Sequence, residues 1–337
     1  MRNYLLPETG RFYKANLHSH STVSDGRWTP EEIKTRYMAQ GYSVVAYTDH
    51  GLMVPHAHLT DDSFVALNGV EYGVNNLNLS RPGLPYRARK NCDICMIALE
   101  PDNYIQPCWN KDKEVPEQYR DIALVDPSRT DFKMQYAPDV INAMIDEGRK
   151  QGFFVTYNHP VWSSEVYTDY MCYENMNAME ICNYGSVCSG HDEHNSKIYQ
   201  DMLRGGKRLF CIATDDNHNK PGKPDSFGGF TMIKAEKLEY RSITDALVKG
   251  HFYASEGPLI EELYYENGKV YIATSPAQAI FAAKGTKNAA VCWGKDEPIR
   301  EAVFEIDPED RYFWLTVVGE NGAKAYTNAY FLDELMK

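Results

Sequence analysis

Residues 12–21 read FYKANLHSHS, an apolar-rich run that ends in two histidines separated by one residue. The segment Phe12 to Leu17 has the composition of a β-strand. Because side chains alternate along an extended chain, His18 and His20 are expected on the same side of it. Two imidazoles presented in this way suit one divalent ion, or one ion each at two neighbouring sites. The stretch therefore predicts a strand that carries metal ligands at its carboxyl end.

Predicted strands and helices alternate from this point up to residue 213. A helix is expected from Pro30 to Met38, with Thr29 as its N-cap and Gly41 after its end. The other expected helices cover 139–150 and 195–203, and the other expected strands cover 43–47, 64–70, 153–157, 178–182 and 209–213. Such repetition predicts an α/β fold with a mainly parallel sheet, open or closed into a barrel.

Residues that can bind a metal follow these strands one after another. In folds of this class the functional side chains sit at the carboxyl ends of the strands. Beyond His18 and His20, the residues at those positions are Asp49, His50, Glu71, His159, Asp216 and His218. Any one of them is explained as a structural residue, but the whole series is not. The pattern predicts that they gather at one end of the sheet.

The residue types in this series indicate an open, catalytic metal site. Imidazole favours zinc, iron or manganese, and carboxylates can bridge two ions. Cys92 and Cys95 form the only CxxC, which leaves no second pair for a closed four-thiolate zinc site. Several ions a few ångströms apart would lower the pKa of a bridging water and generate hydroxide.

The pattern changes near residue 251, after which strands follow one another without a long helix. Asn267-Gly268 predicts a tight hairpin turn between two of them. We therefore expect a barrel domain over residues 1–256 and a small antiparallel β-sandwich over 257–337. Residues 79–135 are expected to form an irregular insertion, whose Arg81, Arg87, Arg89 and Lys90 could hold an anionic leaving group.

The amino-acid composition limits the kinds of molecule that this protein is expected to bind. The chain has 337 residues, 43% of them hydrophobic, and a formal net charge of −12. This charge argues against a nucleic-acid binder, whereas a small anionic substrate can bind where metal ions supply positive charge. No apolar run reaches the roughly 18 residues of a membrane span, and Met1 to Gly10 lacks the apolar core of a signal peptide. We expect a cytoplasmic protein, with a homo-oligomer left open.

Several motifs together resemble one known family. The runs Asn16-Leu17-His18-Ser19-His20-Ser21, Ser24-Asp25-Gly26 and Tyr47-Thr48-Asp49-His50 closely resemble the PHP (polymerase and histidinol phosphatase) domain. Gly69-Val70-Glu71, Asn158-His159-Pro160 and Thr214-Asp215-Asp216-Asn217-His218 look like its later motifs, in the correct order. The segment 246–258 is similar to the junction before a C-terminal β-domain in a branch related to carbaryl-type hydrolases.

The resemblance implies a distorted (β/α)7 TIM-like barrel that carries two or three divalent ions, zinc, manganese or iron. By motif, His18, His20, Glu71 and Asp216 would hold the first ion, with Glu71 bridging to a second ion held by His159. A third ion would be held by Asp25, His50 and His218. The family usually supplies a further histidine shortly after the bridging glutamate. Here Asn76 is the candidate for that position.

Three other residues are candidates for catalysis. Asp49 could orient His50 or cap a turn, and His191 and His194 could contact a phosphate or act as a general acid. The combined prediction is a metal-dependent hydrolase, most directly a phosphoesterase that uses a metal-bridging hydroxide. Two alternatives remain at this point. One is a carboxylic ester or carbamate hydrolase that uses the same metals, and the other is a catalytically weakened metal-binding protein.

Overall fold

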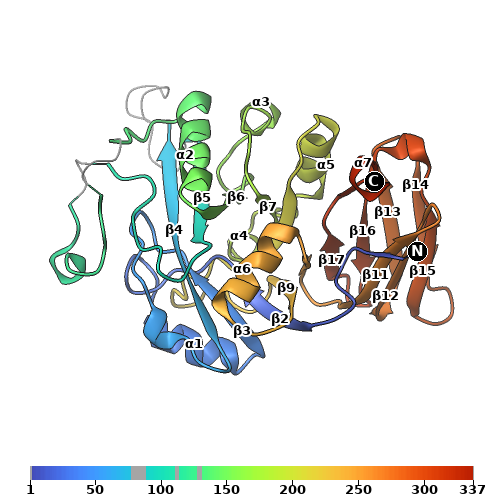
Figure 1. The fold of residues 1–337 in the computed structure, drawn as a ribbon, viewed down its shortest axis with the longest axis horizontal. Coiled ribbons are helices and arrows are strands. Elements are labelled where there is room, and N and C mark those ends of the chain that lie inside the picture. The colour runs from blue at the N-terminus through green and yellow to red at the C-terminus, as the bar shows by residue number, and fades with distance from the viewer. Residues whose placement is uncertain (1, 77–88, 111–113, 127–130, 337) are drawn as a thin grey trace.

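The computed structural model describes residues 2–76, 89–110, 114–126 and 131–336. Figure 1 shows a larger part in which strands and helices mix, and a smaller part that is mostly β-strand and contains both chain ends. The α/β class expected from the sequence is confirmed. Within the described ranges, no helix is long and apolar enough to cross a bilayer.

Seven neighbouring strands form the sheet that carries the metal-binding motifs. In sheet order they are β2 (Arg11–Asn16), β3 (Tyr42–Tyr47), β4 (Val65–Asn75), β5 (Asn91–Ala98), β6 (Phe153–Asn158), β7 (Ala178–Asn183) and β8 (Phe210–Thr214). Four of the pairs are parallel, as expected, but β5 is antiparallel to both β4 and β6. This strand lies within residues 79–135, which the sequence analysis had treated as irregular.

The sheet does not close into a hydrogen-bonded barrel among the residues that the structure describes. To close the barrel, β8 would have to pair with the outer edge of β2. That edge pairs instead with β9 (Phe230–Ala235), which runs antiparallel to β2. The ends of β2 and β8 still approach each other, and a single bridge between Ser19 and Asn217 joins them. Of the expected distorted (β/α)7 barrel, the described residues show the mixed α/β sheet but no closed barrel. Curvature nevertheless brings the ends of all these strands to one place.

The described helices differ in where they pack, because the longer ones lie on this sheet and the last one lies in the C-terminal part. They are α1 (Pro30–Met38), α2 (Pro138–Lys150), α3 (Tyr167–Tyr170), α4 (Tyr184–Cys188), α5 (Ser196–Arg204), α6 (Tyr240–Lys249) and α7 (Leu332–Leu335), with 3₁₀ turns at Ala57–Leu59, Glu117–Tyr119 and Pro308–Asp310. The start predicted for α1 is confirmed, because Thr29 and Glu32 form a reciprocal capping box. Its Ile33 and Tyr37 are buried against β3 and its neighbours.

The C-terminal part consists of two sheets that share one core. The first contains β1 (Asn3–Tyr4), β11 (Ile260–Glu266), β12 (Lys269–Ala277) and β15 (Ile299–Glu305). The second continues the large sheet from β9 through β10 (Phe252–Ser255), β17 (Lys324–Thr327), β16 (Tyr312–Val318), β13 (Ala279–Lys284) and β14 (Ala289–Trp293), with β18 (Tyr330–Phe331) beside β16. Apolar side chains from both sheets, such as Leu263 and Phe313, form one cluster.

The C-terminal part contains one turn that the sequence predicts and one strand pairing that it does not. The turn at Asn267-Gly268 is confirmed, and both residues have the positive φ that such a turn requires. The first strand, β1, pairs with β11, and Leu5 and Leu6 join the core between the two sheets. The start of the chain therefore packs in the C-terminal part. The domain boundary near residue 256 stays a prediction.

Candidate metal centre

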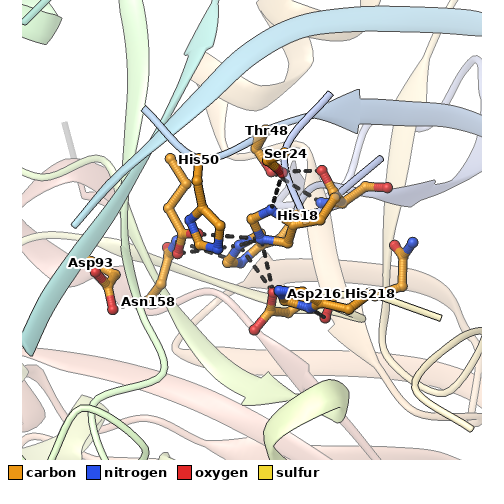
Figure 2. A network of polar contacts seen from close by, with 12 residues as sticks. His18, Ser24, Thr48, His50, Asp93, Asn158, Asp216 and His218 are labelled. Atoms are coloured by element: carbon orange, nitrogen blue, oxygen red, sulfur yellow. Dashed lines mark hydrogen bonds and ion pairs between the residues drawn. The ribbon is translucent and has the colours of Figure 1, made fainter. Parts of the chain in front are cut away.

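Motif residues from the ends of β2, β3, β6 and β8 and from within β4 converge beside a cavity of about 470 Å³. Figure 2 shows His18, His50, Asp216 and His218 turned toward one another, with Asp93 to one side. The structure thus brings together His18, His20, Asp25, His50, Glu71, His159, Asp216 and His218. His18, His20 and Glu71 are almost completely buried, whereas Asp25 and His50 lie at the open side.

Four side chains form the first group, and their donor atoms lie at closely similar distances. His18 Nε2 lies 3.1 Å from His20 Nε2 and 3.3 Å from both Glu71 Oε1 and Asp216 Oδ1. His20 Nε2 lies 3.2 Å from Glu71 Oε2 and 3.0 Å from Asp216 Oδ1. Ligands about 2.1 Å from one ion would be separated by about 3.0 Å in an octahedron and about 3.4 Å in a tetrahedron. The first group therefore has the spacing of a coordination shell.

Two buried carboxylate oxygens in the first group also indicate a place for a metal ion. Glu71 Oε2 and Asp216 Oδ1 accept no well-aligned hydrogen bond from any described residue, although imidazole nitrogens lie 2.9 to 3.2 Å from them. A buried carboxylate oxygen without a donor is costly unless a cation satisfies it. The residues present thus fit a divalent ion.

The carboxylates of the first group and the imidazoles around them, including those of His50 and His159, compensate one another's charge. Burial alone would raise the pKa of Glu71, but the imidazoles of His18, His50 and His159 outweigh it and hold that pKa well below its usual range. Burial would lower the pKa of His159, yet Glu71 and Asp216 raise it to about 10. Protons on the imidazoles thus balance the carboxylates here. A divalent cation can replace those protons.

A second group is formed by Glu71, His159 and Asp93, whose donor atoms lie within 4.8 Å of one another. His159 Nε2 is 3.1 Å from Glu71 Oε1, and its Nδ1 is 3.9 Å from Asp93 Oδ2. Burial and the negative charge of Glu71 raise the pKa of Asp93 to about 7. Asp93 is the residue that sequence reasoning missed. The available signal was an acid in the middle of the apolar run NCDICMIA.

Asn76, which the sequence suggested in place of the family's further histidine, is not part of the second group. Its side-chain oxygen accepts a hydrogen bond from the Lys90 amide at 2.9 Å, so it closes the end of the β4–β5 hairpin. Because β4 continues past Glu71, the five residues to Asn76 span roughly 16 Å of extended chain. The antiparallel partner strand supplies Asp93 instead.

The third group lies at the mouth of the cavity and consists of Asp25, His50 and His218, with His20 beneath them. Asp25 Oδ1 lies 3.2 Å from His218 Nε2 and 3.6 Å from His50 Nε2. His50 Nδ1 lies 2.9 Å from Glu71 Oε2, which connects this group to the first one. Glu71 belongs to the first and second groups, and His20 connects the first group to the third. The three groups therefore form one continuous cluster.

Glu180 fixes the orientation of the first group from behind. This fully buried residue of β7 has one carboxylate oxygen 2.8 Å from His18 Nδ1, and the other accepts the His159 amide at 2.9 Å. Thr214 also donates to it, at 2.6 Å. A carboxylate on Nδ1 leaves Nε2 unprotonated and free to ligate a metal. Glu180 is thus a positioning residue for His18.

The backbone is strained at two of the proposed ligands. His159 has a φ of 25° and Asp216 a φ of 48°, in the region that non-glycine residues rarely adopt. Asp215, next to Asp216, accepts hydrogen bonds at 2.8 to 2.9 Å from the amides of Phe227, Gly228 and Gly229. These contacts hold the loop after β8 in place. Strain of this kind clusters at functional sites, where the surrounding structure stabilises it.

The three residues proposed for catalysis do not face the cavity. The Asp49 carboxylate accepts hydrogen bonds from the amides and hydroxyls of Ser21 and Ser24, at 2.6 to 3.1 Å, rather than from His50. It shapes the loop that carries Asp25. Among described residues, the cavity lining includes neither His191 nor His194, and His194 instead contacts Glu256 at 2.9 Å. A catalytic role of these two histidines therefore stays a prediction that the cavity lining does not support.

Positive charge at the cavity comes from two lysines that the sequence analysis did not single out. Lys220 and Lys223 line the opening, and Lys220 Nζ lies 2.8 Å from Asp25 Oδ2. Of the basic residues in the insertion, Arg81 and Arg87 lie outside the described residues, and Lys90 pairs with Asp169. Among the described residues, the cations that line the cavity therefore follow β8.

Comparisons with known proteins give structural likeness only. No protein-family model matches the sequence, and none of the curated proteins matches it either. Among solved structures, a two-domain protein from Bacteroides vulgatus that contains a predicted PHP-like metal-dependent phosphoesterase is 14% identical, with a TM-score of 0.43 over 98% of this chain and 99% of that one.

A second similar structure is an amidohydrolase from Chromobacterium violaceum with bound sulfate and no metal. It is 16% identical, with a TM-score of 0.37 over 62% of this chain and 89% of that one. These two neighbours are thus a protein with a predicted PHP-like metal-dependent phosphoesterase and an amidohydrolase.

Proposed function

We propose that the protein is a metal-dependent hydrolase that cleaves small phosphate esters. The observation that carries the proposal is the spacing of 3.0 to 3.3 Å among the donor atoms of His18, His20, Glu71 and Asp216. These residues come from the end of β2, the interior of β4 and the end of β8, which are far apart in the sequence. A purely structural cluster would satisfy its buried carboxylate oxygens with hydrogen-bond donors instead.

Two or three divalent ions, zinc, manganese or iron, would occupy the cluster. The first group would hold one ion, Glu71 with His159 and Asp93 a second, and Asp25 with His50 and His218 a third. Bound divalent ions lower the pKa of water and neutralise charge on a phosphoryl group. Glu180 keeps His18 Nδ1 protonated, so that Nε2 remains available to the first ion.

The cavity supports a small, anionic substrate. A volume of about 470 Å³ lies within the range of small-molecule sites. Lys220 and Lys223 at its opening add local positive charge to a chain whose net charge is −12. Ser186, Ser189 and Trp162 also line the cavity, and the Trp162 ring offers an aromatic surface for the organic part of an ester. These side chains would bind and orient the phosphate and exclude bulky alcohols.

The proposal is tested with purified protein reconstituted separately with Zn²⁺, Mn²⁺ and Fe²⁺. Each form is assayed on an aryl phosphate, an aryl carboxylate ester and an aryl carbamate that share one leaving group. We expect the phosphate to react fastest and His18→Ala to remove that activity. The matched control is His58→Ala, because His58 is exposed and contacts Glu31 rather than the cluster.

The other outcomes separate the alternatives. Faster reaction with the carboxylate ester or carbamate would replace the phosphoesterase proposal with a carbonyl hydrolase that uses the same ions. Stoichiometric metal binding without turnover of any substrate would indicate a metal-binding protein that has lost catalysis. Equal activity of wild type and His18→Ala would exclude the proposed centre altogether.

A further inference from the structure

A second set of metal-ligand side chains lies outside the cavity. Cys182 belongs to β7, His194 lies in the segment after α4, and Glu256 follows β10. Their donor atoms all lie within 4.8 Å of one another, and His194 Nε2 is 2.9 Å from Glu256 Oε1. An isolated antiparallel bridge joins Cys182 to His194. The set shares no residue with the three groups at the cavity.

The His194 ring is oriented as a ligating imidazole usually is. Its Nδ1 lies 3.4 Å from Asp192 Oδ1, while Nε2 lies on the Glu256 carboxylate. A carboxylate on one ring nitrogen fixes the tautomer and leaves the other nitrogen for a metal. The Asp192 side chain is 93% exposed, so it approaches the ring from the solvent side.

The donor set suits zinc. A thiolate, an imidazole and a carboxylate are all zinc ligands, and a soft thiolate disfavours magnesium, calcium and manganese. Cys182 is fully buried, whereas the side chains of His194 and Glu256 are 31% and 14% exposed. A water from the solvent side can therefore complete a tetrahedral shell. On binding, the Cys182 thiol releases its proton to solvent, and no electron transfer is involved.

We propose that Cys182, His194 and Glu256 bind a structural zinc ion that ties β7 to the start of the C-terminal part. Glu256 stands at this junction, because its amide donates to the Lys324 carbonyl at 2.9 Å and the chain then enters β11. The ion would link three segments and would add to the contacts already there, which are the hydrogen bond from the Asn195 amide to the Ile181 carbonyl at 2.8 Å and the His194–Glu256 pair. It would stabilise the packing of the two parts against each other.

The test uses the full-length protein loaded with Zn²⁺ or Co²⁺. Cobalt bound through a thiolate gives a near-ultraviolet charge-transfer band that cobalt bound only through nitrogen and oxygen lacks. We expect this band in the wild type and its loss in Cys182→Ser, together with the loss of one equivalent of Zn²⁺ by elemental analysis. His194→Gln, a change at a partly exposed position, is expected to lose the same equivalent and provides a second variant if Cys182→Ser folds poorly.

The matched control is Cys95→Ser. Cys95 is a buried thiol whose sulfur lies near His18 and Glu71 of the first group, so it is the other candidate source of a thiolate band. We expect Cys95→Ser to retain the band. A band that disappears in Cys95→Ser but persists in Cys182→Ser would overturn the proposal, as would a wild type without a band. If Cys182→Ser and His194→Gln both keep the zinc content of the wild type, the proposal is also overturned. The three residues are then a His194–Glu256 ion pair beside a thiol.

Discussion

Asp93 lies opposite Gly73 in the β4–β5 ladder, so close that a Cβ at residue 73 would come within 2.3 Å of Asp93 Oδ1. The two strands are antiparallel, and this register turns the Asp93 carboxylate toward Glu71 and His159. The absence of a side chain at residue 73 is therefore what allows Asp93 to occupy the second metal group.

Gly73→Ala should consequently displace Asp93 and weaken binding of the second ion. Gly73 does not have a positive φ, so alanine is compatible with the backbone and the protein should fold. We expect about a tenfold loss of affinity for that ion, in the range seen when the support of a metal ligand is disturbed. Titration calorimetry with Mn²⁺ measures it. Gly257→Ala, where the nearest atom would be at 3.4 Å, is the control and should bind as the wild type does.

Asp93→Asn should remove one ion and leave the first group occupied. An amide oxygen is a weaker ligand than a carboxylate, while the side chains of the first group are untouched. Elemental analysis after gel filtration should show one equivalent less than in the wild type. Asp62→Asn, at an exposed position, is the control. If Asp93→Asn retains every ion, Asp93 is not a ligand.

Glu180→Gln should lower activity by about ten- to a hundredfold through His18. The amide group replaces one of the two oxygens that face His18, Thr214, Asn183 and the His159 backbone, so a donor there loses its acceptor. We expect kcat and metal affinity to fall while KM changes little, because Glu180 lies behind the ligands. Glu301→Gln, on an exposed face of β15, serves as the control. A change in KM alone would contradict the positioning role.

Lys220→Ala should weaken the binding of anionic substrates selectively. Lys220 stands at the cavity opening and is about half exposed, so its effect is screened by solvent. We expect KM for an aryl phosphate to rise by up to about tenfold, or ~1.4 kcal/mol, with kcat largely retained. The rise should shrink at high salt, and a neutral aryl ester should show none. Equal effects on both substrates would point to a structural role instead.

Glu165 should make the protein less stable as the pH rises from 4.5 to 7. Burial, the largest influence, raises the pKa of Glu165 from 4.5 to about 7, although three tyrosine hydroxyls (Tyr136, Tyr157 and Tyr173) donate to it and oppose the shift. In this window the folded protein retains a proton that the unfolded chain has released, so the free energy of unfolding decreases with pH.

The Glu165→Gln variant isolates this contribution, because glutamine cannot titrate. Denaturant unfolding of wild type and variant at a series of pH values gives the difference in the free energy of unfolding. We expect the wild type to lose stability relative to the variant as the pH increases through the window, and the difference to level off above it. Parallel curves would show that the Glu165 pKa is not raised in the folded protein.

Local patterns in the sequence located much of the fold. The α1 helix was predictable because Thr29, Pro30 and Glu32 act within one helical turn. The turn at Asn267-Gly268 was predictable for a similar reason, since both residues accept positive φ. The strand β5 was missed because its neighbours in sequence, from residue 79 onward, resemble an irregular loop. With that strand, Asp93 was missed as well.

The spacing of motifs also located most of the candidate centre, since a polar residue after a buried strand reaches the same end of the sheet whichever helix follows. It could not decide where the Asn76, Asp49 and His194 side chains point. Those directions depend on contacts with Lys90, with Ser21 and Ser24, and with Glu256, respectively. Each of these partners except Lys90 lies more than 20 residues away in the chain.

The sequence by itself determined the α/β class, the β-rich C-terminal part and the order in which potential ligands reach the strand ends. These follow from side-chain periodicity and turn residues, whose effects extend over a few positions. Tertiary structure alone decided that β9 takes the edge of β2, that the antiparallel β5 brings Asp93 to Glu71, and that His194 meets Cys182 and Glu256. Strand partners are chosen by the burial and hydrogen bonding of the whole sheet, a competition among distant segments that no local pattern records.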